Sequence, residues 1–483
     1  MEIFGINLSS KKNSKIIQSP VSPNNDDGSS VIPTSGYYSI ALDLDNNIKS
    51  ENELIRKYRE LSLYADCDSA IEDIVNEAIT IDNSKNIVNL SFNDKDINEK
   101  LKKAIQDEFD NILSLMNFNI HAHDLFRSWY IDGRLYYNII IDEENKKNGI
   151  AELRLIEPLK IKKIKKINKV KKNGIEIIDN IEEFFLYNDL GLDSNSYNGV
   201  KMNIDSVVFA NSGLIDSETN LIISYLHKAI KPTNQLKMIE DSLVIYRISR
   251  APERRIFYID VGNLPKVKAE QHVADIMNKF RNRITYDATT GEVKTNKRNL
   301  SMMEDFWMPR RDGKSTEITT LPGAMNLGEI EDVNYFQNKL FQALNVPISR
   351  LRPDMAFNLG RSSEITRDEI KFNKFINRLR SKFSTILLDI LRIQLILKNV
   401  INVDDWDDIK NSIVIVFSRD NHFAELKDSE ILQNRIATLQ NIDPFVGKYY
   451  SVDWIRKNVL MQTDDEIAEI DKYNKENPIN TEE

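Results

Sequence analysis

Apolar residues recur at steps of three and four along much of this chain, which is the period of an amphipathic α-helix. The clearest series lies within residues 52–81 and runs from Leu54 to Ile79. A longer stripe over 363–398 predicts one helix of about 50 Å, since each residue adds about 1.5 Å. The same spacing predicts further helices over 96–116, 121–131, 234–250, 266–284, 328–344, 422–439 and 452–460.

Two helix ends carry their own signals. Asn345 and Pro347 close the helix over 328–344, because Asn tolerates the left-handed conformation at a C-terminus and Pro cannot continue a helix. Thr463 and Glu466 stand three residues apart, as in a capping box, and predict the start of a last helix.

Shorter apolar runs bounded by turn residues predict strands. These runs are 134–142, 151–157, 254–261 and 413–417. The region 285–322 carries Gly, Thr, Asn and Pro with short apolar pieces, so we expect small strands and turns there. The predicted fold class is therefore α+β and helix-rich.

The most basic segment is Lys160–Lys172, KIKKIKKINKVKK. One hypothesis is a nucleic-acid-binding patch. The isoleucines recur among the lysines, however, and Asn173-Gly174 is a hairpin turn signal. We therefore favour a strand pair with one buried and one solvated side.

Two amphipathic helices, 266–284 and 328–344, flank a compact insertion at 285–322. A long hairpin of this kind has no large core of its own. Its apolar stripes need neighbours, which predicts oligomerisation independently of any family resemblance.

Composition changes this picture in three respects. A net charge of −9 argues against a simple tight DNA binder, whose affinity comes from neutralising phosphates, and is compatible with a conduit through which DNA slides. Cys67 is the only cysteine, so an internal disulfide is excluded. Residues 1–50 are rich in Pro, Ser, Asn, Asp and Gly, and we expect a flexible arm there. We find no transmembrane or secretory segment.

No catalytic constellation stands out. His121 and His123 resemble a metal-ligand pair, but residues two apart do not share a helix face. Asp404, Asp405 and their neighbours around Trp406 resemble a nuclease cluster, and a solvated turn is the better interpretation. The chain also has no GxxxxGK[ST] phosphate loop, so it is not an ATP-driven motor. We expect no enzyme activity, no metal and no cofactor.

Several long blocks occur in an order that resembles one known family. They are YRELSLYADCDSAIEDIVNEAI at Tyr58–Ile79, WYIDGRLYYNIIID at Trp129–Asp142, RAPERRIFYIDVGNLP at Arg250–Pro265, EDFWMPRRDGKSTEITTLPG, GEIEDVNYFQNKLFQALNVPISRLRPD, SSEITRDEIKFNKFINRLRSKF at Ser362–Phe383 and FSRDNHFAELKDSEIL at Phe417–Leu432. Together they resemble the portal vertex protein of T4-like tailed bacteriophages, the head-to-tail connector. The resemblance covers roughly 55–435, while the first 50 residues and 185–200 match poorly.

The resemblance implies the phage portal fold, with wing, stem, clip and crown regions in subunits that assemble as a ring. Mapped onto this chain, it implies a flexible arm at 1–50, a wing at 51–265, stem helices at 266–284 and 323–346 around a clip at 285–322, a channel loop at 347–362, a long helix with the wing return strand at 363–420, and a crown with the C-terminal tail at 421–483.

The resemblance also implies partners. The subunits form a homo-oligomeric ring, expected to be a dodecamer, with double-stranded DNA passing through its channel. Further partners are the major capsid and scaffold proteins, the large terminase ATPase that packages DNA, and the neck and tail connector proteins. The expected location is the capsid portal vertex of the virion, after assembly in the host cytoplasm, with the inner membrane face as one assembly site.

Two sets of residues are candidates for these contacts. Arg350, Arg352, Asn358 and Arg361 belong to the channel loop and are candidates for contact with DNA; the alternative for the arginines is salt bridging to a neighbouring subunit. Trp307, Arg310 and Arg311 of the clip are candidates for partner docking; the alternative for the arginines is ordinary surface charge. Two other functions stay open: a nucleic-acid-binding or processing protein, and a tail or baseplate structural protein without a channel.

Overall fold

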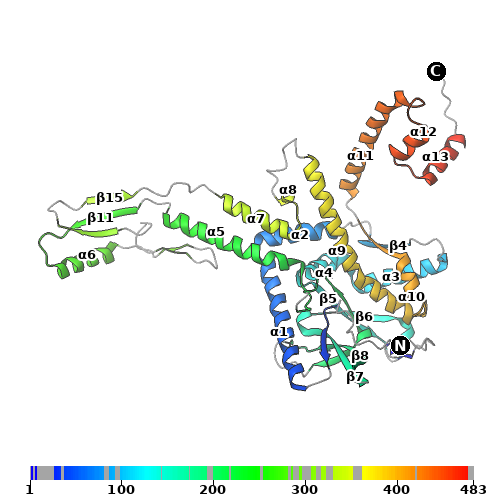
Figure 1. The fold of residues 1–483 in the computed structure, drawn as a ribbon, viewed down its shortest axis with the longest axis horizontal. Coiled ribbons are helices and arrows are strands. Elements are labelled where there is room, and N and C mark those ends of the chain that lie inside the picture. The colour runs from blue at the N-terminus through cyan, green and yellow to red at the C-terminus, as the bar shows by residue number, and fades with distance from the viewer. Residues whose placement is uncertain are drawn as a thin grey trace. The chain divides into compact units, whose positions relative to one another are not determined.

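The computed structural model describes most of the chain: residues 2–3, 6–7, 27–33, 37–80, 86–92, 98–142, 144–172, 175–192, 199–216, 219–250, 254–280, 284–286, 293–295, 306–311, 317–321, 330–351, 362–418 and 421–476. It divides into two compact units (Figure 1). The first comprises Met1–Ile79 and Leu90–Ile415, and the second comprises Thr80–Asn89 and Val416–Glu483.

Helices make up much of the first unit, and most lie where the apolar periodicity predicted them. They are α1 (Tyr37–Ser62), α2 (Ala65–Ala78), α3 (Glu99–Leu115), α4 (Phe118–Asp132), α5 (Ile230–Arg250), α6 (Lys266–Phe280), α7 (Glu331–Leu344), α8 (Ile348–Leu351), α9 (Ser362–Leu397) and α10 (Trp406–Ser412). The single helix predicted over 52–81 is two helices, because the chain turns at Leu63 and Tyr64.

The strands are short and form several small sheets, which confirms the α+β class. They are β1 (Glu2–Ile3), β2 (Ile6–Asn7), β3 (Ser30–Pro33), β4 (Val88–Phe92), β5 (Arg134–Ile141), β6 (Ile150–Ile156), β7 (Ile161–Lys172), β8 (Ile175–Tyr187), β9 (Val200–Asn203), β10 (Val207–Asn211), β11 (Arg254–Asp260), β12 (Ile284–Tyr286), β13 (Val293–Thr295), β14 (Phe306–Arg310), β15 (Glu317–Leu321) and β16 (Ile413–Phe417). Their orders are β10-β5-β6, β3-β7-β8-β9, β14-β11-β15, β1-β2, β12-β13 and β16-β4.

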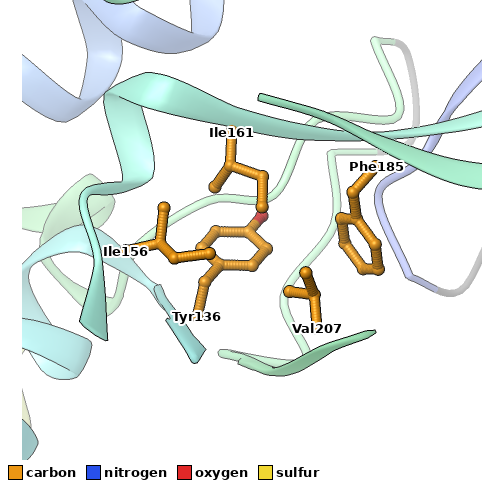
Figure 2. Close-up of a cluster of buried hydrophobic side chains, with 5 residues drawn as sticks. All are labelled: Tyr136, Ile156, Ile161, Phe185 and Val207. Carbon is orange, nitrogen blue, oxygen red and sulfur yellow. The ribbon is translucent and has the colours of Figure 1, made fainter. Parts of the chain in front are cut away.

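The two larger sheets share one apolar core. Tyr136 of β5, Ile156 of β6 and Val207 of β10 pack against Ile161 of β7 and Phe185 of β8 (Figure 2). All five side chains are buried. Removing this much apolar surface from water is the main force that holds the two sheets together.

A second core forms where α9 packs against α2 and α3 and brings an aromatic ring against α4. The Phe383 ring of α9 lies 5.1 Å from the Phe126 ring and 5.5 Å from the Trp129 ring, both on α4. The apolar stripe predicted for the long helix faces this core, since Phe372, Ile376 and Leu379 are buried as well. Burial of the stripe keeps α9 continuous over 36 residues.

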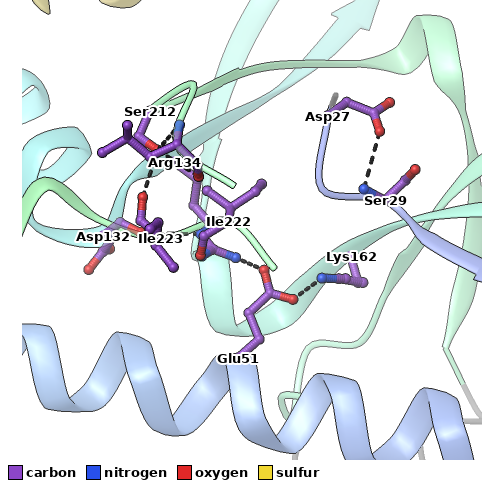
Figure 3. Close-up of polar contacts among 10 residues, drawn as sticks. Asp27, Ser29, Glu51, Asp132, Arg134, Lys162, Ser212, Ile222 and Ile223 are labelled. Atoms are coloured by element: carbon purple, nitrogen blue, oxygen red, sulfur yellow. Dashed lines mark hydrogen bonds and ion pairs between the residues drawn. The ribbon is translucent and has the colours of Figure 1, made fainter. Parts of the chain in front are cut away.

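Buried charges dock α1 onto this core. Glu51 of α1 forms ion pairs with Arg134 of β5 and Lys162 of β7 (Figure 3). All three residues are buried, and burial lowers the pKa of Arg134 to about 10. One carboxylate thus pairs with two buried cations. Among the described residues neither cation has another carboxylate partner, so both would be left buried and unpaired if α1 left the core.

The basic run forms strand β7, and β7 pairs with β8 in antiparallel register, so the strand-pair interpretation is confirmed. The expectation that its lysines lie on a solvated side is wrong for Lys162, Lys163 and Lys165, which are buried. Lys163 and Lys165 lie 2.7 and 2.9 Å from the Asp27 carboxylate, which makes burial of their charges tolerable. The predicted turn at 173–174 lies outside the described residues.

The segment predicted as a flexible arm contains regular structure in its described part. Strand β3 pairs with β7, and α1 begins at Tyr37. The composition of 1–50 did not reveal this because the partners of β3 and of Asp27 lie more than a hundred residues away along the chain.

The helices that flank the small sheet have different packing partners. Helix α7 packs along α5 (Figure 1). Helix α6 packs on β14 instead. Ala269, Val273 and Ile276 of α6 contact a cluster made by Ile259, Val261 and Trp307. The apolar stripe on α6 is therefore partly buried, and it packs against the small sheet.

The second unit is mainly helical, with α11 (Asn421–Ile442), α12 (Val452–Asn458) and α13 (Asp464–Glu476). The predicted capping box is present: the Thr463 amide donates to Glu466 Oε2 over 2.8 Å, and the Glu466 amide donates to Thr463 Oγ1 over 3.4 Å. Arg456 of α12 pairs with Asp471 of α13 over 2.8 Å. This ion pair links the last two helices.

Candidate functional sites

The predicted channel segment begins where α7 ends. Asn345 adopts the left-handed conformation with φ of 61°, and its amide donates to the Gln342 and Phe341 carbonyls. The short helix α8 follows, and α9 begins at Ser362. The Asn345 and Pro347 stop signal predicted from the sequence is thus confirmed, and it directs the chain away from the axis of α7.

Arg350 of α8 lies among three carboxylates of its own chain. Its guanidinium makes a bidentate pair with Glu369 of α9, over 2.9 and 2.7 Å. It also donates to Glu77 over 3.0 Å and to Asp73 over 3.4 Å, both on α2. The same group lies over the Phe372 ring, 4.5 Å from its centroid.

These contacts give Arg350 a structural role. Burial acts to lower the pKa of Arg350, but its hydrogen bonds to Glu369 and the nearby carboxylates outweigh burial and hold the pKa above its ordinary value. Burial raises the pKa of Asp73 in the same cluster. A guanidinium shared among α2, α8 and α9 is poorly placed to contact DNA phosphates, so its charge is explained without DNA or a neighbouring subunit.

Sequence reasoning did not find the carboxylates around Arg350. Asp73 and Glu77 lie more than 270 positions before it, and nothing local marks them. The other candidates of the channel loop, Arg352, Asn358 and Arg361, lie outside the described residues and stay predictions.

The predicted docking residues belong to the sheet β14-β11-β15. Strand β14 is parallel to β11, with Trp307 opposite Phe257, and their rings stack at 4.3 Å with an interplanar angle of 9°. Trp307 is half-buried on the face that α6 covers, so part of its surface is committed to the fold.

Arg310 and Arg311 differ from each other. Arg310 pairs with Glu317 of β15 over 2.8 Å, and its guanidinium lies 5.5 Å from the centroid of the Tyr258 ring. Arg311 follows the strand and is exposed. Because side chains alternate along a strand, Phe306 and Met308 lie on the face opposite Trp307, and both are exposed at 36% and 44%. One face of the sheet is therefore open at Phe306 and Met308, and Arg311 is exposed just beyond the end of β14.

The described residues contain no group of three or more His, Cys, Asp or Glu side chains arranged to hold a metal ion. His123 instead contacts Asn76 over 3.2 Å and Glu72 over 3.5 Å. Asp407 and Asp408 lie in the first turn of α10, where negative side chains favour the helix dipole. Across the described part of the chain, no helix combines the length and apolarity that a membrane span requires.

Comparison with known proteins identifies the family. The model of the bacteriophage T4-like portal protein (Gp20) matches residues 51–477. A portal protein of Vibrio phage KVP40 is 41% identical over 94% of this chain and 93% of its own length. A portal protein of Salmonella phage ViI is 34% identical, over 92% of this chain and 82% of its own.

Among solved structures, a chain from the neck of an empty GTA particle computed with C6 symmetry has a TM-score of 0.45 and 11% identity, over 85% of this chain and 93% of its own. A chain from the neck of the native GTA particle computed with C12 symmetry has a TM-score of 0.41 and 10% identity, over 82% and 89%.

Portal proteins are structural connectors rather than enzymes, and they form homo-oligomeric rings at the portal vertex of the capsid. A match that extends over most of the chain, together with two relatives more than 30% identical across nearly their whole length, places this sequence among them. The chain belongs to the T4-like portal protein family.

Proposed function

We propose that twelve copies of this chain form a ring whose channel admits double-stranded DNA during packaging and releases it at infection. The observation that carries the proposal is the family match over 51–477. In this role the ring nucleates capsid assembly with the major capsid and scaffold proteins. It then docks the terminase ATPase during filling and the neck and tail proteins afterwards.

The contacts between helices suggest a revised assignment of segments to the regions of the subunit. We assign the stem to α5 and α7, because these two helices pack along each other. Helix α6 then belongs with β11, β14 and β15 to the clip, because its apolar stripe packs on that sheet. The wing contains the two facing sheets, and the crown contains the helices after about residue 420.

Exposed apolar side chains support the stem assignment. Met238 and Ile245 of α5 are 64% and 51% exposed, and Tyr335 of α7 is 60% exposed. In a ring, such side chains can be covered by the stem of an adjacent subunit. Met238→Lys with Tyr335→Lys should therefore yield folded monomers, whereas rings from this double variant would argue against the assignment.

The first experiment is electron microscopy of the purified chain. Rings with a central hole about as wide as duplex DNA would support the proposal. Persistent monomers or dimers, even at high concentration and with scaffold protein added, would favour a binding module instead. Deletion of 351–361 should leave rings intact and impair packaging or retention of DNA; filled, infectious particles would refute the role of this loop.

Assembly in the host cytoplasm, with the inner membrane face as one site, is a separate part of the proposal. Fractionation of infected cells would locate the rings before capsids form. Rings found only in completed capsids would oppose it.

A further inference from the structure

The first half of α9 carries a row of positive side chains on its outer face. Their spacing of four, three, four and four residues places them on one side of the helix. They are Arg367, Lys371, Lys374, Arg378 and Lys382, and all are exposed. The row is about 22 Å long at 1.5 Å per residue.

Few negative charges oppose this row. Among the described residues of this stretch, Asp368 lies 3.9 Å from Arg367 and 3.1 Å from Lys371, and Glu369 pairs with Arg350 instead. Within the described part of the chain, Lys374, Arg378 and Lys382 form no ion pair with a carboxylate. A chain with a net charge of −9 has therefore concentrated unpaired cations on one helix face.

The neighbouring exposed positions are mostly small and polar. Apart from Ile370, they are Asn377, Ser381 and Thr385. Amide and hydroxyl side chains of this kind, together with Arg and Lys, supply most protein contacts to DNA phosphates. The composition of the face therefore matches a phosphate backbone.

A hollow of about 830 Å³ runs beside the row, between α9 and the end of α7 with α8. Arg367, Lys371, Lys374 and Arg378 line it. Gln342, Asn345 and Ser349 also line it, and their side chains can donate hydrogen bonds. Asp368 lines it as well, so phosphate oxygens entering the hollow would meet four cations, neutral donors and one carboxylate.

We infer that this face of α9 binds the phosphate backbone of duplex DNA, independently of base sequence. An acidic surface of another protein is the competing partner. Three of the five cations are lysines, however, and protein interfaces are depleted in lysine, whereas phosphate contacts are not. The inference rests on the proposed function, in which DNA is cargo, and it adds a contact surface outside the predicted channel loop.

The test compares two charge-matched variants of the full-length chain. Lys374→Gln/Arg378→Gln/Lys382→Gln removes three cations of the row. Lys57→Gln/Lys100→Gln/Lys103→Gln removes three exposed cations from α1 and α3. Binding of a linear, mixed-sequence duplex is measured by filter retention over a range of salt concentrations, and native mass spectrometry records the oligomeric state.

The row variant should bind DNA about tenfold more weakly at low salt. The slope of its plot of log affinity against log salt concentration should be less negative by about 2.7, since each of the three lost phosphate contacts removes about 0.9 from the slope. The control variant has the same net charge and should keep the parental slope. Equal slopes for the two variants would overturn the inference.

Two other outcomes are informative. Loss of rings in the row variant alone would overturn the inference and make this face an interface between copies. If the parent forms no rings, the proposed function fails, while the DNA comparison still decides the role of the row on monomers. Should the triple variant misfold by circular dichroism, Lys374→Gln/Lys382→Gln repeats the test and keeps Arg378 over Phe375.

Discussion

Arg350 and Glu369 form a bidentate ion pair that joins α8 to α9 and brackets the segment 352–361 in sequence. The same guanidinium reaches Asp73 and Glu77 on α2. Both members of the pair are about three-quarters buried, so the pair is only weakly screened by solvent. The start of the long helix is thereby anchored on α2.

Replacing Arg350 with Ala should lower the free energy of unfolding by about 2–3 kcal/mol, because three carboxylates are left without their shared cation. Glu369→Gln should cost less, since Asp73 and Glu77 still contact the arginine. Denaturant titration of both single variants and the double variant would give a coupling free energy of about 1–2 kcal/mol. Additive effects would show that the pair contributes no stability.

The buried triad of Glu51, Arg134 and Lys162 should be sensitive to removal of its carboxylate. Glu51→Gln leaves two buried cations unpaired and should destabilise the protein by about 3–5 kcal/mol. Replacing all three residues with apolar side chains of similar size should cost less than this single change. Thermal unfolding compares the two, and a more damaging triple variant would contradict the explanation.

The ion pairs of Asp27 with Lys163 and Lys165 should make the protein less stable in acid. Burial acts to raise the pKa of Asp27, but hydrogen bonds from Lys163 and Lys165 outweigh burial and hold the pKa below its ordinary value. A depressed folded-state pKa stabilises the protein above the unfolded value of about 3.9, and this contribution is lost as the pH falls below it. Asp27→Asn should therefore flatten the acid limb of stability against pH, while Asp189→Asn, at an exposed site, should change the curve less.

Substitutions at Trp307 and at Arg311 should have different effects, the first on stability and the second on partner docking. Trp307→Ala removes the ring stacked on Phe257 and should cost about 2 kcal/mol of stability, measured by far-UV circular dichroism in denaturant. Arg311→Ala changes an exposed side chain and should alter stability by no more than about 0.5 kcal/mol. Under the proposed function, Arg311→Ala weakens binding of the terminase ATPase to the ring; unchanged binding would remove Arg311 from the docking surface.

Local structure followed the sequence closely. The apolar period of three and four predicted α9 within a residue at each end, and the strand 413–417 is β16. The capping box at Thr463 and the left-handed Asn345 were predicted from side-chain chemistry alone. Each of these features depends on residues within a turn or two of one another, so the chain encodes it locally.

Long-range partners could not be predicted in this way. The apolar stripe on α6 predicted that the helix is packed against a neighbour, but it did not identify the small sheet as that neighbour. The lysines of β7 were predicted to be exposed to solvent. In the structure, Asp27 and Glu51 lie beside three of them and pair with them. Arg350 was a candidate for contact with DNA on sequence grounds. In the structure it pairs with Asp73, Glu77 and Glu369.

The sequence by itself determined most of the helices, several of the strands and the portal family, because periodicity, caps and ordered blocks are all properties of the linear chain. Only the tertiary structure decided which charges are paired and which remain open. Ion pairing depends on distances of a few ångströms between residues that are one to three hundred positions apart. For that reason Arg350 became a structural residue, and the cations along α9 became the candidates for contact with DNA.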